Sequence, residues 1–149
     1  MKILILNGPN IQLLGKREID IYGKTTLKEI KDSLTKKASD LNSNLGLVFF
    51  QSNYEGGILD KISSSFVEKY DGIIINPAAY THTSIAIYDA LRAVQIPVIE
   101  VHISNIYRRE EFRKHSVTAS ACTGQITGLG VDGYVLALQA LVKIIEKDK

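Results

Sequence analysis

Short apolar runs alternate with longer amphipathic segments along this chain. The runs carry many residues of high β-propensity, and they lie at Lys2–Leu6, Leu47–Gln51, Gly72–Asn76, Pro97–Val101 and Gly124–Thr127. Four of them are short and largely apolar, which is typical of strands that are buried on both faces of a parallel sheet. The pattern therefore predicts five β-strands.

The segments between these runs have helical periodicity. The first opens with a capping box, in which Glu29 follows Thr26 by three residues. Apolar residues then recur at helical spacing on four stripes, which consist of Leu27, Ile30, Leu34, Ala38 and Leu41; Ile58, Ile62 and Phe66; Ala86, Ala90, Leu91 and Val94; and, behind Asp132, Leu136, Ala140, Leu141, Ile144 and Ile145. Each stripe predicts a helix with one buried face.

Strands that alternate with helices imply right-handed βαβ crossovers and a doubly wound α/β sandwich. We expect one flavodoxin-like domain over residues 1–149, with a five-stranded parallel sheet in the order 2-1-3-4-5 and helices on both faces. In such a sheet, ligands bind outside the carboxyl ends of the strands, at the switch between strands 1 and 3. The polar segments that follow strands 1, 3 and 4 are residues 7–10, 76–82 and 100–105. The predicted site lies where these segments meet.

Composition limits the class of protein. The chain has 149 residues, of which 45% are hydrophobic and 23% charged, and this is typical of a globular domain rather than a disordered or fibrous chain. A formal net charge of +2 gives no argument for nucleic acid or a membrane as partner. One cysteine cannot form an intramolecular disulfide, and no apolar run suits a signal peptide or a membrane span. We therefore expect a cytoplasmic protein.

Glu100 and His102 are the first candidate pair. They are two residues apart at a predicted strand end, so their side chains project to the same face. A carboxylate beside an imidazole selects its tautomer and favours its charged form, which suits a proton donor near neutral pH. The alternative is a structural pair that caps the strand. The position at the predicted ligand-binding edge favours the functional interpretation.

Residues 15–23 form a charged loop that is bounded by glycines and has no clear period, which is typical of a lid or binding loop. Its candidate residues are Arg17 and Tyr22. A free phenol ionises near pH ~10 and is a poor base at neutral pH. A guanidinium at ~5 Å in an effective dielectric of ~20 favours the phenolate by about 3 kcal/mol. A surface contact between the two side chains is the alternative.

The segment after the fourth strand predicts a capped short helix, with Ser104 and Asn105 at its start and residues 107–115 behind them. Free N–H groups at this start would suit a substrate carboxylate, with an arginine such as Arg113 as a second clamp. A solvated helix of mixed charge is the alternative, and it is our interpretation of Glu110, Glu111 and Lys114.

Three other features are interpreted as structural. Residues 128–133 match a dinucleotide-binding fingerprint literally, but they follow the last predicted strand and no further βαβ unit follows them, so they predict a tight strand-to-helix turn. His82, Asp89, Glu100 and His102 have no known metal-ligand spacing. Cys122 has no adjacent His or Lys, and it is interpreted as a packed small residue.

Over nearly its whole length the sequence resembles the type II 3-dehydroquinate dehydratases. The matching blocks are NGPN at 7–10, LLGKRE at 13–18, IYG at 21–23, QSNYEG at 51–56, INPAAYTHTS at 75–84, IEVHISN at 99–105, RREEFRKHS at 108–116 and GYVLAL at 133–138. The resemblance implies a flavodoxin-like hydro-lyase without cofactor or metal. Its small-molecule substrate would be 3-dehydroquinate, converted to 3-dehydroshikimate in aromatic biosynthesis (the shikimate pathway) or quinate breakdown.

The resemblance also implies residue roles for an anti elimination without a Schiff base. Tyr22, held as phenolate by Arg17, would take the proton at C2, and an enolate stabilised by water near Asn10 would follow. His102, oriented by Glu100, would protonate the departing C1 hydroxyl. The implied substrate-binding residues are Asn76, His82, Arg113 and the backbone of Ile103 and Ser104. Asp89 would reach into a neighbouring subunit's site, which implies a homotrimer and, in this family, a dodecamer of four trimers.

Four positions depart from the family pattern. Gln12 stands where Asn is common, Ile19 where Pro is common, Ala78 where Gly is common, and Tyr88 where Arg is frequent. The first two flank the loop and bear on its rigidity. Ala78 bears on the turn beside Asn76, and Tyr88 bears on the contact between subunits.

Two other functions suit a flavodoxin-like fold. A nucleotide or flavin carrier needs a phosphate loop rich in glycine and hydroxyl groups after the first strand, where this chain has Asn7-Gly8-Pro9-Asn10. A receiver domain needs clustered aspartates there, and the chain has none at these positions. The lysine Schiff-base route to the same dehydration uses a TIM barrel of roughly 250 residues. The residues therefore favour the lyase.

Overall fold

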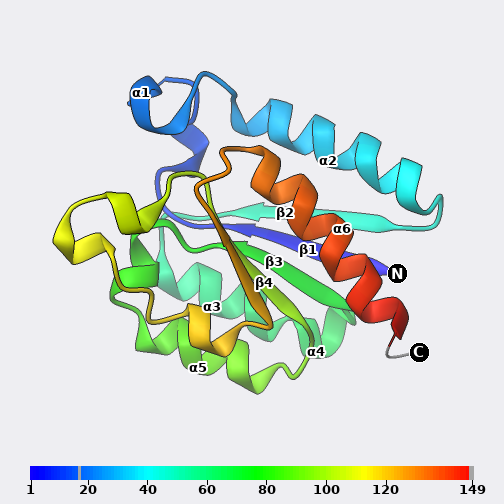
Figure 1. Cartoon of the computed structure of the whole chain (residues 1–149). Helices are drawn as coiled ribbons and strands as arrows, with labels where there is room; N and C mark the ends of the chain where they lie inside the picture. Colours follow the sequence, from blue (N-terminus) through cyan, green and yellow to red (C-terminus); the bar gives the residue numbers. More distant parts are fainter. Residues whose placement is uncertain (17, 148–149) are drawn as a thin grey trace.

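The predicted strands form one parallel sheet in the order β2-β1-β3-β4-β5, so the predicted topology is confirmed. The computed structural model describes residues 1–16 and 18–147. The strands are β1 (Lys2–Asn7), β2 (Gly46–Gln51), β3 (Gly72–Asn76), β4 (Val98–His102) and β5 (Gly124–Thr127) (Figure 1). Each strand agrees with its predicted run to within one residue at either end.

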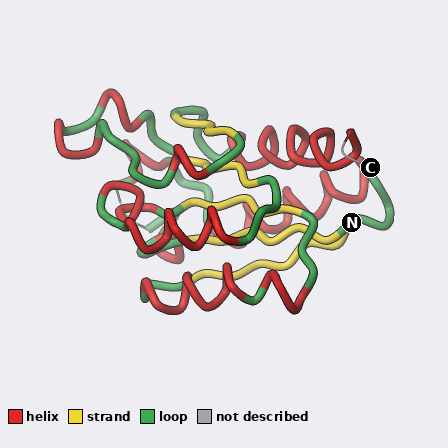
Figure 2. Tube along the Cα trace, turned by 90° about the horizontal axis from the view of Figure 1, so that it is seen from below, coloured by secondary structure: helices red, strands yellow, loops and turns green. Residues whose placement is uncertain are grey.

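Helices cover both faces of the sheet. One layer consists of α2 (Leu27–Leu41) and α6 (Asp132–Lys147), and the other consists of α3 (Glu55–Ser63), α4 (Ser65–Glu68) and α5 (Ile85–Ala93) (Figures 1 and 2). Side chains of β1 alternate between the two layers, with Ile3 and Ile5 in one apolar core and Leu4 and Leu6 in the other. The start of β1 and the end of α6 lie at the amino-terminal end of the strands, which leaves the carboxyl end for the site (Figure 1).

Local signals predict α2 well. The Thr26 hydroxyl oxygen accepts a hydrogen bond from the Glu29 N–H, and the Glu29 carboxylate accepts one from the Thr26 N–H at 2.7 Å, so the capping box is present. The middle of the predicted stripe, Ile30, Leu34 and Ala38, is buried.

Two predicted helix faces are wrong in part. Phe66 is 58% exposed, because the helix is interrupted at Ser64, between α3 and α4, and the last turn rotates away from the core. In α5, Ala86 is exposed and the buried face is formed by Ile87, Leu91 and, just beyond the helix, Val94. Small alanines gave too weak a signal to define this face.

The buried face of α6 is displaced from the predicted one by part of a turn. Leu136 is 42% exposed, and the buried residues are Gly133, Tyr134, Ala137, Leu138, Leu141, Val142 and Ile145. The helix is apolar over much of its circumference, so periodicity alone did not distinguish two overlapping stripes. A buried tyrosine at the start of the helix decides its rotation.

Residues 128–133 form the predicted tight turn between β5 and α6. Gly128 has a φ of 85°, and a Cβ atom there would lie 2.7 Å from the Cβ of Asn105. Both the left-handed backbone and the close approach therefore require glycine.

Cys122 packs against the core on the α3–α5 side, as predicted, and burial together with the Glu100 charge raises the pKa of its thiol to about 12. No helix within the described residues is both long enough and apolar enough to span a bilayer.

Candidate active site

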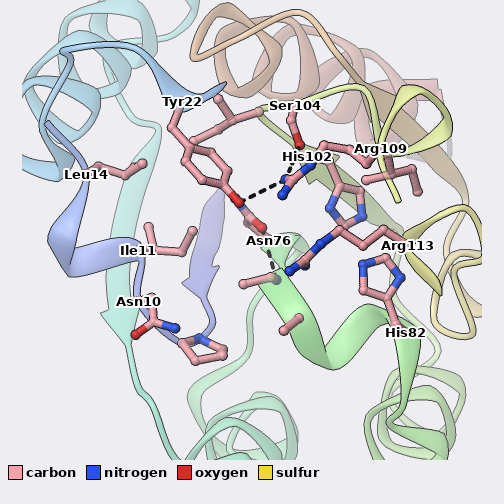
Figure 3. Close-up of a pocket in the computed structure, with 15 residues that line it drawn as sticks. Asn10, Ile11, Leu14, Tyr22, Asn76, His82, His102, Ser104, Arg109 and Arg113 are labelled. Carbon is pink, nitrogen blue, oxygen red and sulfur yellow. Dashed lines mark hydrogen bonds between the residues drawn. The ribbon is translucent and has the colours of Figure 1, made fainter. Parts of the chain in front are cut away.

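A cavity of about 120 Å³ lies at the carboxyl ends of β1, β3 and β4, at the expected switch point. It is lined by eight residues that the sequence singled out: Asn10, Tyr22, Asn76, His82, His102, Ile103, Ser104 and Arg113 (Figure 3). Glu100 lies behind His102, and Arg109 is a further lining residue. Arg17 falls outside the described residues. Asp89, on α5, is exposed and outside this cavity, so its implied role in a neighbouring subunit stays a prediction.

Glu100 and His102 lie on the same face at the end of β4, as predicted. The Glu100 side chain is fully buried, and its Oε1 atom lies 2.7 Å from His102 Nε2. Four further side chains surround the carboxylate: the hydroxyl groups of Thr81, Ser116 and Thr118, and the amide of Gln125. We call these four residues the carboxylate cage.

His102 and two hydroxyl groups of the carboxylate cage keep Glu100 charged. Burial alone disfavours a charged Glu100, but the hydrogen bond and charge of His102, with the Thr118 and Ser116 hydroxyl groups, lower the pKa of Glu100 to about 2. A charged carboxylate only accepts hydrogen bonds, so His102 carries a hydrogen on Nε2. No described residue forms a hydrogen bond with Nδ1 of His102, which leaves that atom to exchange a proton with a ligand.

Tyr22 meets a cation that the sequence analysis did not single out. It lies at the end of the short helix α1 (Ile19–Tyr22), and its Oη atom accepts a hydrogen bond from Arg109 Nη1 at 3.0 Å. The same guanidinium lies 5.6 Å from the centre of the Tyr22 ring and donates to Ser104 Oγ at 3.3 Å. Burial disfavours the charge of Arg109, but its bonds and charge interactions with Tyr22 and Glu110 raise its pKa above the ordinary value. Arg109 therefore places a permanent positive charge against the phenol oxygen.

Glu110 is exposed, as its interpretation as a solvated residue predicts, and it also lies between Arg109 and Arg113. Its Oε2 atom lies 3.3 Å from Arg109 Nε and 3.2 Å from Arg113 Nε, although the side chain is 51% exposed. The neighbouring pair, Glu111 and Lys114, is an exposed ion pair, as expected of solvated charges. One carboxylate thus holds two cavity arginines at a defined separation.

The segment after β4 does not form the predicted helix. Asn105 caps a three-residue 3-10 turn, η3 (Ile106–Arg108), by accepting a hydrogen bond from the Tyr107 N–H at 3.1 Å. Arg109 then adopts an extended backbone, and a second 3-10 turn, η4 (Glu111–Arg113), follows. The break between the turns brings the arginine side chains to the cavity. The predicted cap is confirmed, and the predicted helix behind it is wrong.

Asn76 and His82 present defined hydrogen-bonding groups. Asn76 Oδ1 accepts from the Ala78 N–H at 3.1 Å, so its Nδ2 faces the other way. Burial lowers the pKa of His82, and its Nδ1 lies 2.7 Å from the carbonyl oxygen of His115. A carbonyl only accepts, so the neutral ring carries its hydrogen on Nδ1 and keeps Nε2 as an acceptor.

Asn10 is held by its backbone. It has a φ of 67°, in the left-handed region, and its N–H donates to Asn53 Oδ1 at 3.0 Å. Gln12, where the family pattern has Asn, accepts from Gln51 Nε2 at 2.9 Å beside this contact. The side chain of Asn10 is exposed and faces the cavity (Figure 3).

Ala78 keeps the turn that glycine is expected to form. Its φ is 52°, which is unfavourable for a residue with a Cβ atom. The Ala78 N–H nevertheless bonds the Asn76 side chain, so the departure from the family pattern leaves the turn beside Asn76 in place.

Sequence reasoning missed Arg109 and the carboxylate cage. The four-residue spacing from Arg109 to Arg113 could have indicated two cavity arginines, although the segment was expected to be one solvated helix. Thr81, Ser116 and Thr118 carry no sequence signal of their own, because they become neighbours only when the chain folds around Glu100. No group of three or more His, Cys, Asp or Glu side chains within the described ranges is placed to hold a metal ion.

Known proteins give this geometry a context. The family model described as dehydroquinase class II matches residues 1–142. A 3-dehydroquinate dehydratase of Caldicellulosiruptor saccharolyticus is 59% identical over 97% of this chain and 98% of its own length. One from Clostridium perfringens is 53% identical over 98% of this chain and 99% of its own.

A solved relative has the same fold. The crystal structure of the type II dehydroquinase from Butyrivibrio crossotus superposes with a TM-score of 0.92 and 48% identity, covering 95% of this chain and 97% of that one. The family model spans most of the chain, and these relatives are similar along nearly all of it. The chain therefore belongs to the class II dehydroquinase family.

Proposed function

We propose that this protein is a hydro-lyase that removes water from 3-dehydroquinate to give 3-dehydroshikimate. The observation that carries the proposal is the presence of two hydrogen-bonded pairs at one cavity, Tyr22 with Arg109 and His102 with Glu100. Removing a proton next to a ketone and expelling a β-hydroxyl group needs one base, one acid and stabilisation of an enolate. The names of the similar proteins support this substrate.

In this proposal Tyr22 is the base. As a phenolate it takes the proton at C2, next to the ketone, and the electron pair of that C–H bond forms the enolate. Arg109 supports the phenolate because its guanidinium donates directly to the phenol oxygen and cannot lose its own proton. Arg17, outside the described residues, is the second cation that the family resemblance implies.

His102 is the acid. The enolate expels the C1 hydroxyl group, which leaves as water after receiving the proton of His102, and Nδ1 is the ring atom free to supply it. Glu100 accepts a hydrogen bond from Nε2 and so keeps that nitrogen protonated while Nδ1 gives its proton to the leaving group. The proposed elimination is anti, as the family resemblance implies, so the proton and the hydroxyl group are lost on opposite faces of the ring.

The remaining cavity residues bind the substrate in this scheme. Asn10 is placed to hold a water against the enolate oxygen. Asn76, His82 and Arg113 face the ring substituents, and the backbone at Ile103 and Ser104 receives the carboxylate. The described residues that line the cavity include no lysine, which favours direct enolate formation over a Schiff base. We further propose a cytoplasmic homo-oligomer, a trimer or dodecamer, in which Asp89 completes a neighbouring site.

Adding 3-dehydroquinate to the purified protein tests the proposal. We expect ultraviolet absorbance of a conjugated enone to appear, and to stay absent with Tyr22→Phe. Borohydride added with substrate separates the two chemistries, because it traps an imine and should leave this enzyme active. Failure to form the enone contradicts the function, and inactivation by borohydride contradicts the mechanism.

A further inference from the structure

A fully buried tyrosine contacts the site from outside the cavity. Tyr134, in the first turn of α6, has no exposed surface, and its Oη atom lies 2.6 Å from Asn7 Oδ1 and 2.8 Å from Asn76 Nδ2. Asn7 and Asn76 are paired residues at the carboxyl ends of β1 and β3, and they are 1% and 3% exposed. The three side chains thus form one buried chain of hydrogen bonds that ends in the cavity wall.

One backbone N–H group decides which atoms donate and which accept along this chain of hydrogen bonds. The Ala78 N–H can only donate, so the atom of Asn76 that faces it is the amide oxygen. Nδ2 of Asn76 therefore faces Tyr134 and donates to its oxygen. The phenol has a single hydrogen, and it must use this hydrogen for the oxygen of Asn7. Burial raises the pKa of Tyr134 well above its ordinary value, which keeps that hydrogen in place.

The direction of the chain has a consequence inside the cavity. Nδ2 of Asn76 carries two hydrogens, and one is used by Tyr134. The other forms no hydrogen bond with any described residue, and Asn76 lines the cavity (Figure 3). We propose that Tyr134 is a positioning residue, which through Asn76 presents one N–H donor to the cavity and so selects a ligand with an acceptor oxygen at that point.

The ligand class follows from the donor. An N–H group donates a hydrogen bond to a hydroxyl, ketone or carboxylate oxygen. It has no acceptor to bond when an ammonium or a methyl group occupies that position. Applied to a ring that carries several hydroxyl groups, the inference rests on the proposed function. We therefore expect Asn76 to donate a hydrogen bond to one substrate oxygen. A hydroxyl group in that position can still donate its own hydrogen to another residue.

Tyr134→Phe tests the proposal kinetically. The ring still fills the core, but Asn76 loses the partner that holds its amide in place. We expect KM for 3-dehydroquinate to rise about tenfold, with kcat within about threefold, because the lost contact is made equally in ground state and transition state. In an Asn76→Ala background, Tyr134→Phe should change KM no further. An unchanged KM, or the same rise in both backgrounds, overturns the proposal.

Tyr70→Phe is the matched control. Tyr70 is also buried, at 4% exposure, and its hydroxyl group bonds Glu68 at the opposite end of the sheet. It should lower the melting temperature without changing KM. Should Tyr134→Phe not fold, Asn7→Ala removes the acceptor of the Tyr134 hydrogen and should raise KM in the same direction.

Hydrogen exchange of the Asn76 side-chain amide gives a readout that needs no turnover. In the wild type, NMR should show slow exchange of the hydrogen that faces Tyr134. Tyr134→Phe should accelerate this exchange at least tenfold, and Tyr70→Phe should leave it unchanged. If the wild type fails to dehydrate 3-dehydroquinate, the proposed function falls while this measurement still decides the positioning role. Unchanged exchange in Tyr134→Phe overturns it.

Discussion

The two halves of the cavity are built differently. Around His102 the wall is part of the sheet, with Glu100 fully buried and the carboxylate cage packed on it from several segments. Around Tyr22 the wall is a four-residue helix in a charged loop, joined through Arg109 to two 3-10 turns. In the scheme proposed above, the acid is held by the core, and the base is held by surface segments that must come together.

This difference predicts distinct sensitivities. A change near His102 affects both stability and chemistry, because it disturbs a buried ionised group. A change near Tyr22 affects chemistry with a smaller effect on stability, because the Tyr22 side chain is only partly buried against the core. The following variants test that contrast.

The largest effect is expected for Tyr22→Phe. Removing the hydroxyl removes the proposed base, so kcat should fall by about 10³-fold or more, while substrate binding and the melting temperature change little. The rate of enone absorbance measures kcat, calorimetric titration with substrate measures binding, and thermal unfolding measures the melting temperature. Retention of most activity rules out Tyr22 as the base.

Arg109→Ala should lower kcat by about 10²-fold, because the phenolate loses a cation that donates to it directly. Arg109→Lys should recover part of the loss, since a lysine keeps the charge but cannot contact Tyr22 and Glu110 at once through a planar guanidinium. If Arg109→Ala is as active as the wild type, Arg17 is the cation that stabilises the phenolate. Arg17→Ala should then show the larger loss of kcat.

Acid unfolding tests the core side. The pKa of Glu100 in the folded protein, about 2, lies below its ordinary value of 4.5. The charged carboxylate therefore stabilises the fold above pH 4.5, and this contribution is lost as the pH falls from about 4.5 to about 2. Urea unfolding of wild type and Glu100→Gln across this range measures it. A variant with the same pH dependence as wild type contradicts the assignment.

The smallest effect is expected for Glu110→Gln. The lost carboxylate is half-exposed, so kcat/KM should fall only about threefold through looser placement of Arg109 and Arg113. Glu111→Gln is the matched control, because Glu111 is 87% exposed and pairs with Lys114. Equal effects of the two substitutions indicate that the bridge between the arginines has no special role.

Periodic features were predicted from the sequence. The capping box at Thr26 and the shared face of Glu100 and His102 depend on spacing along a single segment, because strand and helix geometry fixes where each side chain points. The order of the strands followed from the alternation of strands and helices along the chain, which is typical of a doubly wound sheet. The rotation of α6 was not predicted, because two apolar stripes overlapped and the burial of Tyr134 decided between them.

Contacts between distant segments were decided by the tertiary structure. Arg109 and Tyr22 are 87 residues apart, and Tyr134 and Asn7 are 127 apart. No local pattern connects such residues, since their meeting depends on the conformations of loops and on the packing of helices against the sheet. The sequence by itself determined the sheet and the edge at which chemistry is expected. Packing brought Arg109 to the phenol of Tyr22 and decided which way the amide of Asn76 faces. Buried polar groups cannot bond water, so the folded structure decides their hydrogen-bond partners.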